Sequence, residues 1–210
     1  MSETTPKKQK LSFFYGGARI IATILFHTVM PVKYHHAHRV AGDAPFIVIA
    51  NHSHWMDPII LALPIRRYQV TFLAKKVLVQ NKIASFVLRD MHVIPVDRHN
   101  TDMTAMRSCV KAVRDGNILG IFPEGTRHHK GVMKEIEGGV AMIALRSGVP
   151  LIPVYVTRKL KLFRRSDCWV GEPIELEDLR AQGVNKDTCQ ALLERITATY
   201  VDMQKEAGTL

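Results

Sequence analysis

The chain has 210 residues, 47% of them apolar, which excludes a disordered protein and favours one globular domain with a sizeable core. The net charge is +10, and the basic excess lies in the first four-fifths of the chain, because residues 168–210 carry four Lys and Arg against eight Asp and Glu. This distribution favours an anionic partner, either a membrane surface or a phosphate-bearing substrate. Nucleic acid is the weaker interpretation and we expect no such partner, since aromatic residues are only 7% and no zinc-finger or RNA-binding consensus occurs.

The cysteines argue against a disulfide-stabilised secreted protein. They are three, an odd number, and widely spaced, at Cys109, Cys168 and Cys189. The pattern predicts reduced core thiols in a cytosolic setting, with no Cys-x-x-Cys metal clip.

Residues 1–40 are predicted to form a basic N-terminal segment that associates with a membrane. A polar start, MSETTPKKQK, precedes an apolar run at 11–32, LSFFYGGARIIATILFHTVMPV. Glycine, arginine and histidine interrupt this run, whereas a membrane-spanning helix needs about 20 consecutive apolar residues. We therefore favour a helix or helix pair that lies in the membrane interface, while a spanning helix and an ordinary buried helix stay open. The cations available to lipid phosphates are Lys7, Lys8, Lys10, Arg19 and Lys33.

Residues 41–210 are predicted to form an α/β domain with a mixed, largely parallel central sheet flanked by helices. Apolar runs rich in β-branched residues alternate with helical patterns, which is typical of this class. The expected strands are 45–50, 69–74, 92–97, 118–122, 150–157 and 168–176. The expected helices are one that begins at Thr101 or Asp102 and ends at Gly116, one at 137–147 and one at 187–205. Active residues of such sheets gather at the carboxyl ends of strands, where the polar motifs of this chain also lie.

The segment NHSHWMD, residues 51–57, follows the first expected strand. His52 and His54 suggest a metal site, because His-x-His-x-Asp-His occurs in metallo-β-lactamase-fold hydrolases; here Asp57 comes one residue late and Pro58 replaces the third histidine, so we assign no metal ligand. The alternative is acid–base chemistry, in which Asp57 orients His52 and favours its imidazolium. Asp57-Pro58 also predicts a helix start with Asp57 as the N-cap, and the loop before it lets both side chains meet. Taken alone, the segment leaves a catalytic pair and a plain polar loop open.

A second motif, FPEGTR at 122–127, follows another expected strand and contains a glycine and an arginine that suit phosphate binding. Together, Asn-His-x4-Asp and Phe-Pro-Glu-Gly-Thr-Arg resemble the first and third motifs of the glycerolipid acyltransferases, in particular the bacterial 1-acylglycerol-3-phosphate acyltransferases. HVIPVDR at 92–98 is similar to the second motif and GVPLIPVYV at 148–156 to the fourth, so the resemblance covers about residues 45–156.

The chain departs from the family pattern at three places. Met91 or His92 stands where the second motif usually has a glycine, and Val77 replaces the acidic residue of the family's Ala-Lys-x-Glu-Leu segment, in which Lys75 matches. Glu137 stands where many members have a lysine before a glycine. These departures concern the second-motif backbone and the rim of the acceptor site.

The resemblance implies direct acyl transfer in phospholipid biosynthesis. His52 takes the proton of the 2-hydroxyl of lysophosphatidic acid, Asp57 holds His52, and the alkoxide attacks the thioester of acyl-CoA or acyl-carrier protein to give phosphatidic acid. No metal and no cofactor besides this co-substrate is implied. The implied location is the cytoplasmic face of the cell membrane, with the protein peripheral or monotopic. The implied substrate-binding residues are Lys75, Arg98, Glu124, Gly125, Thr126 and Arg127, of which Arg98, Arg127 and Lys75 hold the acceptor phosphate.

Two questions stay open at this point. The acceptor is alternatively another lysophospholipid or a lyso-aminolipid, and the protein is alternatively a relative that binds lipid without catalysis. The basic, apolar segment RKLKLFRR at 158–165 is interpreted as a loop that faces anionic headgroups, with a solvated loop as the alternative.

Overall fold

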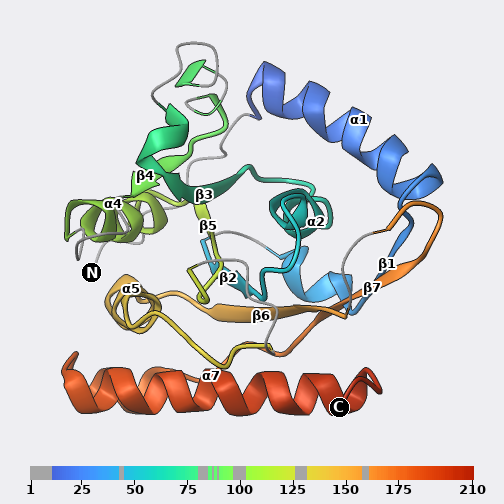
Figure 1. Cartoon of the computed structure of the whole chain (residues 1–210). Coiled ribbons are helices and arrows are strands. Elements are labelled where there is room, and N and C mark those ends of the chain that lie inside the picture. Colours follow the sequence, from blue (N-terminus) through green and yellow to red (C-terminus); the bar gives the residue numbers. More distant parts are fainter. Residues whose placement is uncertain are drawn as a thin grey trace.

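The computed structural model describes residues 11–42, 45–79, 85, 86, 88, 90–96, 103–125, 132–157 and 161–210. Along the chain the elements are α1 (Phe13–Thr28), β1 (Val32–His35), the 3₁₀ turn η1 (Ala37–Val40), β2 (Ile47–Ala50), α2 (Asp57–Ala62), β3 (Val70–Lys75), η2 (Lys76–Val79), β4 (Ile94–Val96), α4 (Met103–Arg114), β5 (Ile118–Ile121), α5 (Gly139–Ser147), β6 (Leu151–Val156), β7 (Ser166–Val170), α6 (Glu177–Ala181) and α7 (Lys186–Glu206) (Figure 1).

One mixed seven-stranded sheet organises these elements, in the order β1-β7-β6-β2-β5-β3-β4. Strands β6, β2, β5, β3 and β4 run parallel, while β7 is antiparallel to β6 and parallel to β1. The register sets Ala50 at the end of β2 beside Val154 of β6, and Ile49 beside Ile121 at the end of β5. The carboxyl ends of β2, β5 and β6 therefore meet at one edge of the sheet, where an α/β protein builds its site.

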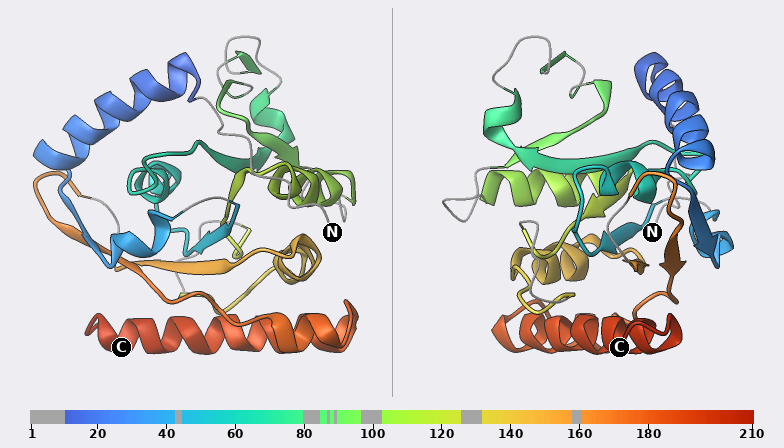
Figure 2. Two further views of the ribbon diagram at one scale, coloured as in Figure 1. Left: turned by 180° about the vertical axis from the view of Figure 1, so that it is seen from behind. Right: turned by 45° about the vertical axis from the view of Figure 1, so that its right-hand side comes forward.

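Alternate residues of the central strands point to opposite faces and form two apolar cores. Ile47, Ile49 and Leu119 belong to the core covered by α4, α5 and α7, whereas Val48 and Val70 belong to the core covered by α1 and α2. Figures 1 and 2 show α7 and α1 on opposite sides of the molecule. The edge of the sheet formed by the carboxyl ends of β2, β5 and β6 thus lies between two faces that are both covered by helices.

The expected fold class is confirmed as an α/β fold with a mixed sheet flanked by helices. All six expected strands form, and the boundaries of the first five differ from the expectation by at most two residues. The last expected strand, 168–176, is wrong in its second half: β7 ends at Val170, because Gly171 and Pro173 interrupt the ladder, and Ile174 makes an isolated bridge to Leu151.

Strand β1 is not predicted by the sequence pattern. It pairs in parallel with β7, with Val32 beside Ser166, and so places part of the 1–40 segment in the sheet. Its four residues, VKYH, are too short and mixed to show a strand period. The division of the chain at residue 40 stays a prediction, but the sheet begins before it.

Helix α1 has two apolar faces. Arg19, which interrupts the apolar run, turns toward the protein and donates to the carbonyls of Ala62, Leu63 and Ile65 at the end of α2, at 3.2, 2.5 and 2.8 Å. Within the described residues, no helix is long and apolar enough to cross a bilayer. The buried side chains of α1 are Tyr15, Ala22 and Phe26, and the exposed large apolar ones are Phe13, Phe14, Ile20, Ile21 and Ile24.

Candidate active site

The loop that follows β2 is anchored by Asn51. Its side-chain amide donates to Val156 O at 3.0 Å, and its carbonyl oxygen accepts from Val156 N at 2.8 Å. The side chain therefore imitates a further pair of sheet hydrogen bonds between the ends of β2 and β6. Asn51 is buried, so this clamp fixes the backbone at the residue before His52.

His52 and Asp57 form a close pair. His52 Nδ1 lies 3.0 Å from Asp57 Oδ2, and the two side chains are 15% and 1% exposed. The expectation that the loop brings them together is confirmed. Because Nδ1 is committed to the carboxylate, Nε2 is the imidazole nitrogen left for a substrate.

Asp57 also holds the loop itself. Its Oδ2 accepts from the backbone N–H groups of Ser53 and His54 at 2.6 and 2.7 Å, while Oδ1 is buried with no hydrogen-bond partner among the described residues. The expected N-cap role is wrong: Met56 is the N-cap and Asp57 is the first helical residue. Its carboxylate accepts hydrogen bonds from the loop that precedes α2, whereas an N-cap side chain accepts them from the first turn of its helix.

His54 has a different environment from His52. Its Nδ1 accepts from the backbone N–H of Met56 at 3.2 Å, which uses one ring nitrogen inside the loop. Among the residues that the structure describes, no group of three His, Cys, Asp or Glu side chains is placed to hold a metal ion.

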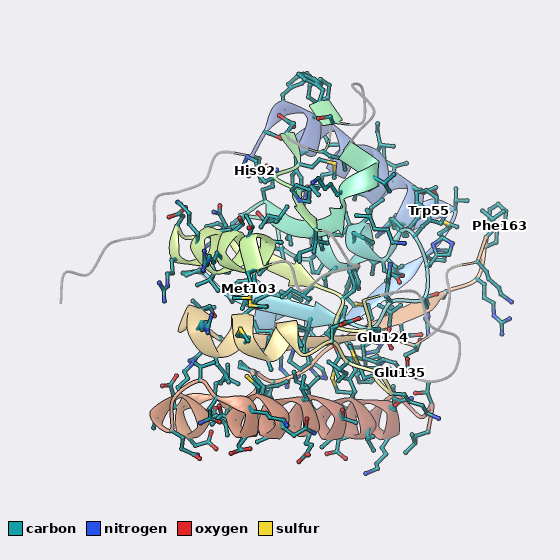
Figure 3. All side chains as sticks on the ribbon, turned by 60° about the vertical axis from the view of Figure 1, so that its left-hand side comes forward. Trp55, His92, Met103, Glu124, Glu135 and Phe163 are labelled. Atoms are coloured by element: carbon teal, nitrogen blue, oxygen red, sulfur yellow. The ribbon has the colours of Figure 1, made fainter. Side chains whose placement is uncertain are left out.

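Glu124 ties the second motif to the first. Its Oε2 accepts from the backbone N–H of His52 and its Oε1 from that of Met133, both at 2.8 Å. Glu124 is 5% exposed and Met133 is fully buried with a φ of +52°. One buried carboxylate therefore holds the backbone of the histidine and a strained turn, and Figure 3 shows Glu124 at the end of the sheet, below the Trp55 loop.

An aromatic stack lies against His52. The ring of Phe122 is 4.4 Å from the imidazole at an interplanar angle of 30°, and Phe72 lies 6.2 Å beyond it at 14°. Gly120 makes room for this stack, because a Cβ there would lie 2.3 Å from the Phe72 ring. An aromatic face beside an imidazole limits its rotation and attracts its charged form.

The remaining expected site residues divide into two groups. Lys75 is exposed at the carboxyl end of β3, and Gly125 adopts a φ of +64° in the turn after β5, where a Cβ would meet the side chain of Glu137 at 2.9 Å. Arg98, Thr126 and Arg127 lie outside the described residues. The structure thus brings His52, Asp57 and Glu124 together and leaves the expected phosphate ligands untested.

Two residues of the site are missing from the expected set, Asn51 and Phe122. Each is the first residue of one of the two motifs and directly follows a strand, and this position was the available signal. Their partners, Val156 and His52, are distant in sequence, so spacing alone does not find the contacts.

Burial explains a strong pKa change near the site. Cys168 of β7 is fully buried, and its thiol pKa is raised far above the usual value by burial, with the carboxylates of Asp57 and Asp167 adding to the effect. This cysteine is therefore a neutral core residue and not a nucleophile.

The site contains the groups for proton transfer from a hydroxyl: a histidine with one free nitrogen, a buried carboxylate behind it and a loop held by backbone bonds. The site resembles a His–Asp pair that activates the hydroxyl of a substrate and not a side-chain nucleophile. Among the described residues, no serine or cysteine side chain is hydrogen-bonded to His52.

Comparison with known proteins agrees with this arrangement. A family model described as Acyltransferase matches residues 8–157. A 1-acyl-sn-glycerol-3-phosphate acyltransferase of Bacillus subtilis is 30% identical over 85% of this chain and 91% of its own length, and one of Streptococcus pneumoniae is 27% identical over 92% and 74%. The solved 1-acyl-sn-glycerophosphate (LPA) acyltransferase PlsC of Thermotoga maritima shares the fold with a TM-score of 0.65, at 21% identity over 90% of this chain and 79% of that one. The matched family model covers both motifs that build the site, and this chain belongs to the acyltransferase family.

Proposed function

We propose that this protein is a 1-acyl-sn-glycerol-3-phosphate acyltransferase, an enzyme that acylates the 2-hydroxyl of lysophosphatidic acid to give phosphatidic acid. The observation that carries the proposal is the His52–Asp57 pair at 3.0 Å on a loop whose backbone Glu124 holds. The names of the relatives from Bacillus subtilis and Streptococcus pneumoniae support the same acceptor.

His52 Nε2 acts as the general base. It takes the proton of the 2-hydroxyl as the oxygen attacks the thioester carbonyl, and Asp57 stabilises the imidazolium that forms. When the tetrahedral intermediate collapses, the C–S bond breaks and the proton passes from His52 to the leaving thiolate. The donor is an acyl thioester of coenzyme A or of acyl-carrier protein, and no further cofactor takes part.

The acceptor phosphate lies among cations at the carboxyl edge of the sheet. Lys75 is the last residue of β3, Arg98 and Arg127 follow β4 and β5 in the chain, and neighbouring parallel strands bring their carboxyl ends to one edge. Gly125 lets the backbone approach the glycerol phosphate, Thr126 contacts the glycerol, and Glu124 positions His52 from inside the fold.

The protein works as a peripheral or monotopic protein on the cytoplasmic face of the membrane. The exposed side chains Phe13, Ile20, Ile21 and Ile24 of α1 follow helical spacing, and the cation of Arg19 is turned inward to α2. A helix with this outward stripe suits the interface of an anionic bilayer. The reduced thiols expected from the sequence agree with the cytoplasmic side.

The deciding experiment is His52→Ala with purified protein, acyl-CoA and lysophosphatidic acid, read by the release of free thiol. We expect loss of turnover by at least about 10³-fold, because the general base is removed. Vesicle binding and the unfolding temperature report that the variant is folded. Turnover at the parent rate would refute the role of His52.

An acceptor panel with one acyl-CoA then separates the alternatives. Transfer that requires a phosphate monoester supports lysophosphatidic acid, and transfer to other lysophospholipids or lyso-aminolipids supports a relative of different specificity. A parent protein that transfers to no acceptor from either thioester would support a lipid-binding module.

A further inference from the structure

We propose that Trp55 of the catalytic loop and Leu162-Phe163 of the β6–β7 turn insert into the interface of an anionic bilayer. These three residues are called the insertion cluster below. The inference rests on the proposed function for the lipid nature of the substrate, and it adds a membrane contact outside α1. Its consequence is that the loop of His52 and Asp57 itself rests on the lipid surface.

The β6–β7 turn presents two large apolar side chains against local preference. Leu162 and Phe163 are 62% and 79% exposed, in a tight turn closed by the N–H of Arg164 donating to Lys161 O at 3.3 Å. Phe163 has a φ of +56°, a conformation that glycine or asparagine adopts at lower cost. Figure 3 shows its ring projecting away from the body of the molecule. A solvated turn gains nothing from this pair, whereas a turn in lipid gains from burying it.

Trp55 lies at the same edge of the sheet. It is 63% exposed and stands between His52 and Asp57 in the chain. Its loop leaves the end of β2, and the segment that leads to Phe163 leaves the end of the adjacent parallel strand β6. In Figure 3 the labelled Trp55 and Phe163 lie toward the same side of the molecule. Tryptophan favours the boundary of lipid and water more than the hydrocarbon or the aqueous phase.

Backbone hydrogen bonds join the β6–β7 turn to the end of α1. The N–H of Phe163 donates to Val29 O at 2.7 Å, and the N–H of Ser166 donates to Pro31 O at 2.9 Å. The turn is thus held beside the helix whose outward stripe is apolar. Because the two are linked at the backbone, they present their apolar side chains with a fixed relative orientation.

The charge distribution specifies an anionic lipid surface as the partner. Lys161, Arg164 and Arg165 are exposed on both sides of the apolar pair. On the opposite side of the molecule from α1 lies α7, within residues 168–210, which carry four basic against eight acidic residues. Attraction of the basic turn orients the insertion cluster toward anionic headgroups.

The first test replaces the tip of the turn in the full-length protein. The Leu162→Ser/Phe163→Ser variant is compared with the parent for partition onto vesicles of phosphatidylglycerol and phosphatidylcholine, without substrate. We expect partition to weaken by about 10- to 100-fold, since each apolar side chain contributes a part of its transfer free energy. The matched control is Leu210→Ser, because Leu210 is 71% exposed beyond the end of α7, and it is expected to leave partition unchanged.

The second test uses Trp55 as a reporter. The chain has two tryptophans, so Trp169→Phe leaves Trp55 as the single one. On addition of the vesicles its emission is expected to shift to shorter wavelength and to be quenched by brominated phospholipid. Unchanged emission from vesicle-bound protein, or partition of the double variant within twofold of the parent, would overturn the inference.

Two further measurements separate this inference from the proposed function. The Leu162→Ser/Phe163→Ser variant is expected to acylate a short-chain, water-soluble lysophosphatidic acid at the parent rate, and neither vesicle measurement depends on acyl transfer. Light scattering tests a second copy of the chain as the occupant. A parent that self-associates through Leu162 and Phe163, and does not bind vesicles, would refute the membrane assignment.

Discussion

Replacing Glu124 by glutamine separates two roles for this residue, holding the catalytic loop from inside the fold and contacting the acceptor. The carboxylate accepts from His52 N and from Met133 N, both at 2.8 Å, in a site that is 5% exposed. Glutamine keeps one acceptor oxygen and turns an NH₂ group toward the other backbone N–H. One charge-assisted hydrogen bond is lost, and a buried donor stays unsatisfied.

The structure sets the size of this effect. A hydrogen bond to a charged group contributes about 1.5–3 kcal/mol, and an unsatisfied buried donor costs about 1–3 kcal/mol, so we expect Glu124→Gln to lower the free energy of unfolding by about 3 kcal/mol. For a chain of this length the midpoint of thermal unfolding then falls by about 6–12 °C. Because the loop of His52 is displaced, kcat is expected to fall by about 100-fold, with the KM for the acceptor changed by less than about threefold.

The assay is thermal unfolding together with steady-state thiol release at several acceptor concentrations. The matched control is Glu137→Gln, because Glu137 is an exposed carboxylate beside Gly125, and its loss changes the local charge without breaking a buried hydrogen bond. We expect that control to unfold at the parent temperature. An acceptor KM raised tenfold in Glu124→Gln, with an unchanged unfolding temperature, would refute the positioning role and assign Glu124 to the substrate.

Three further predictions concern Asp57, Gly120 and Cys168. Asp57→Asn keeps the size of the side chain but removes the charge behind His52, so kcat is expected to fall by about 10³-fold or more in single-turnover assays; a loss below tenfold would contradict the pairing. Gly120→Ala places a Cβ 2.3 Å from the Phe72 ring and is expected to destabilise the fold by about 1–3 kcal/mol in urea unfolding, and an unchanged midpoint would be inconsistent with the close contact. Burial raises the pKa of the Cys168 thiol, so little thiolate forms at pH 8 and maleimide is expected to label Cys168 only after unfolding, as mass spectrometry of the digested protein would show. Rapid labelling of the native protein at Cys168 would contradict its burial.

The expected strands and the His52–Asp57 pair followed from local information. β-branched runs between helical patterns predict an α/β sheet, because strand and helix periods differ within a window of a few residues. His52 and Asp57 are five residues apart, so their contact depends only on a short loop. The two motifs also sufficed to recognise the family.

The contacts that position His52 were decided by the tertiary structure. Glu124 binds the backbone of His52 across 72 residues, and Phe122 stacks on its ring, only because the parallel pairing of β2 and β5 brings their ends together. β1 is likewise a strand only through its partner β7. Such pairings depend on the register between distant segments, and the hydrophobic periodicity of one segment contains no information about that register.

In helix α1, too, some features follow from the local sequence and others only from the tertiary structure. The residue pattern predicts a mainly apolar helix interrupted by Arg19, but it does not show which side of the helix meets the protein, since apolar residues occur on both sides. The carbonyl groups at the end of α2 fix the orientation of α1, because they accept hydrogen bonds from the Arg19 guanidinium. In this orientation Ala22 and Phe26 are buried against the sheet, and Ile20 and Ile24 are exposed. The carbonyl groups at a helix end need donors and a partly buried cation needs acceptors, and the two meet only once both helices are in place.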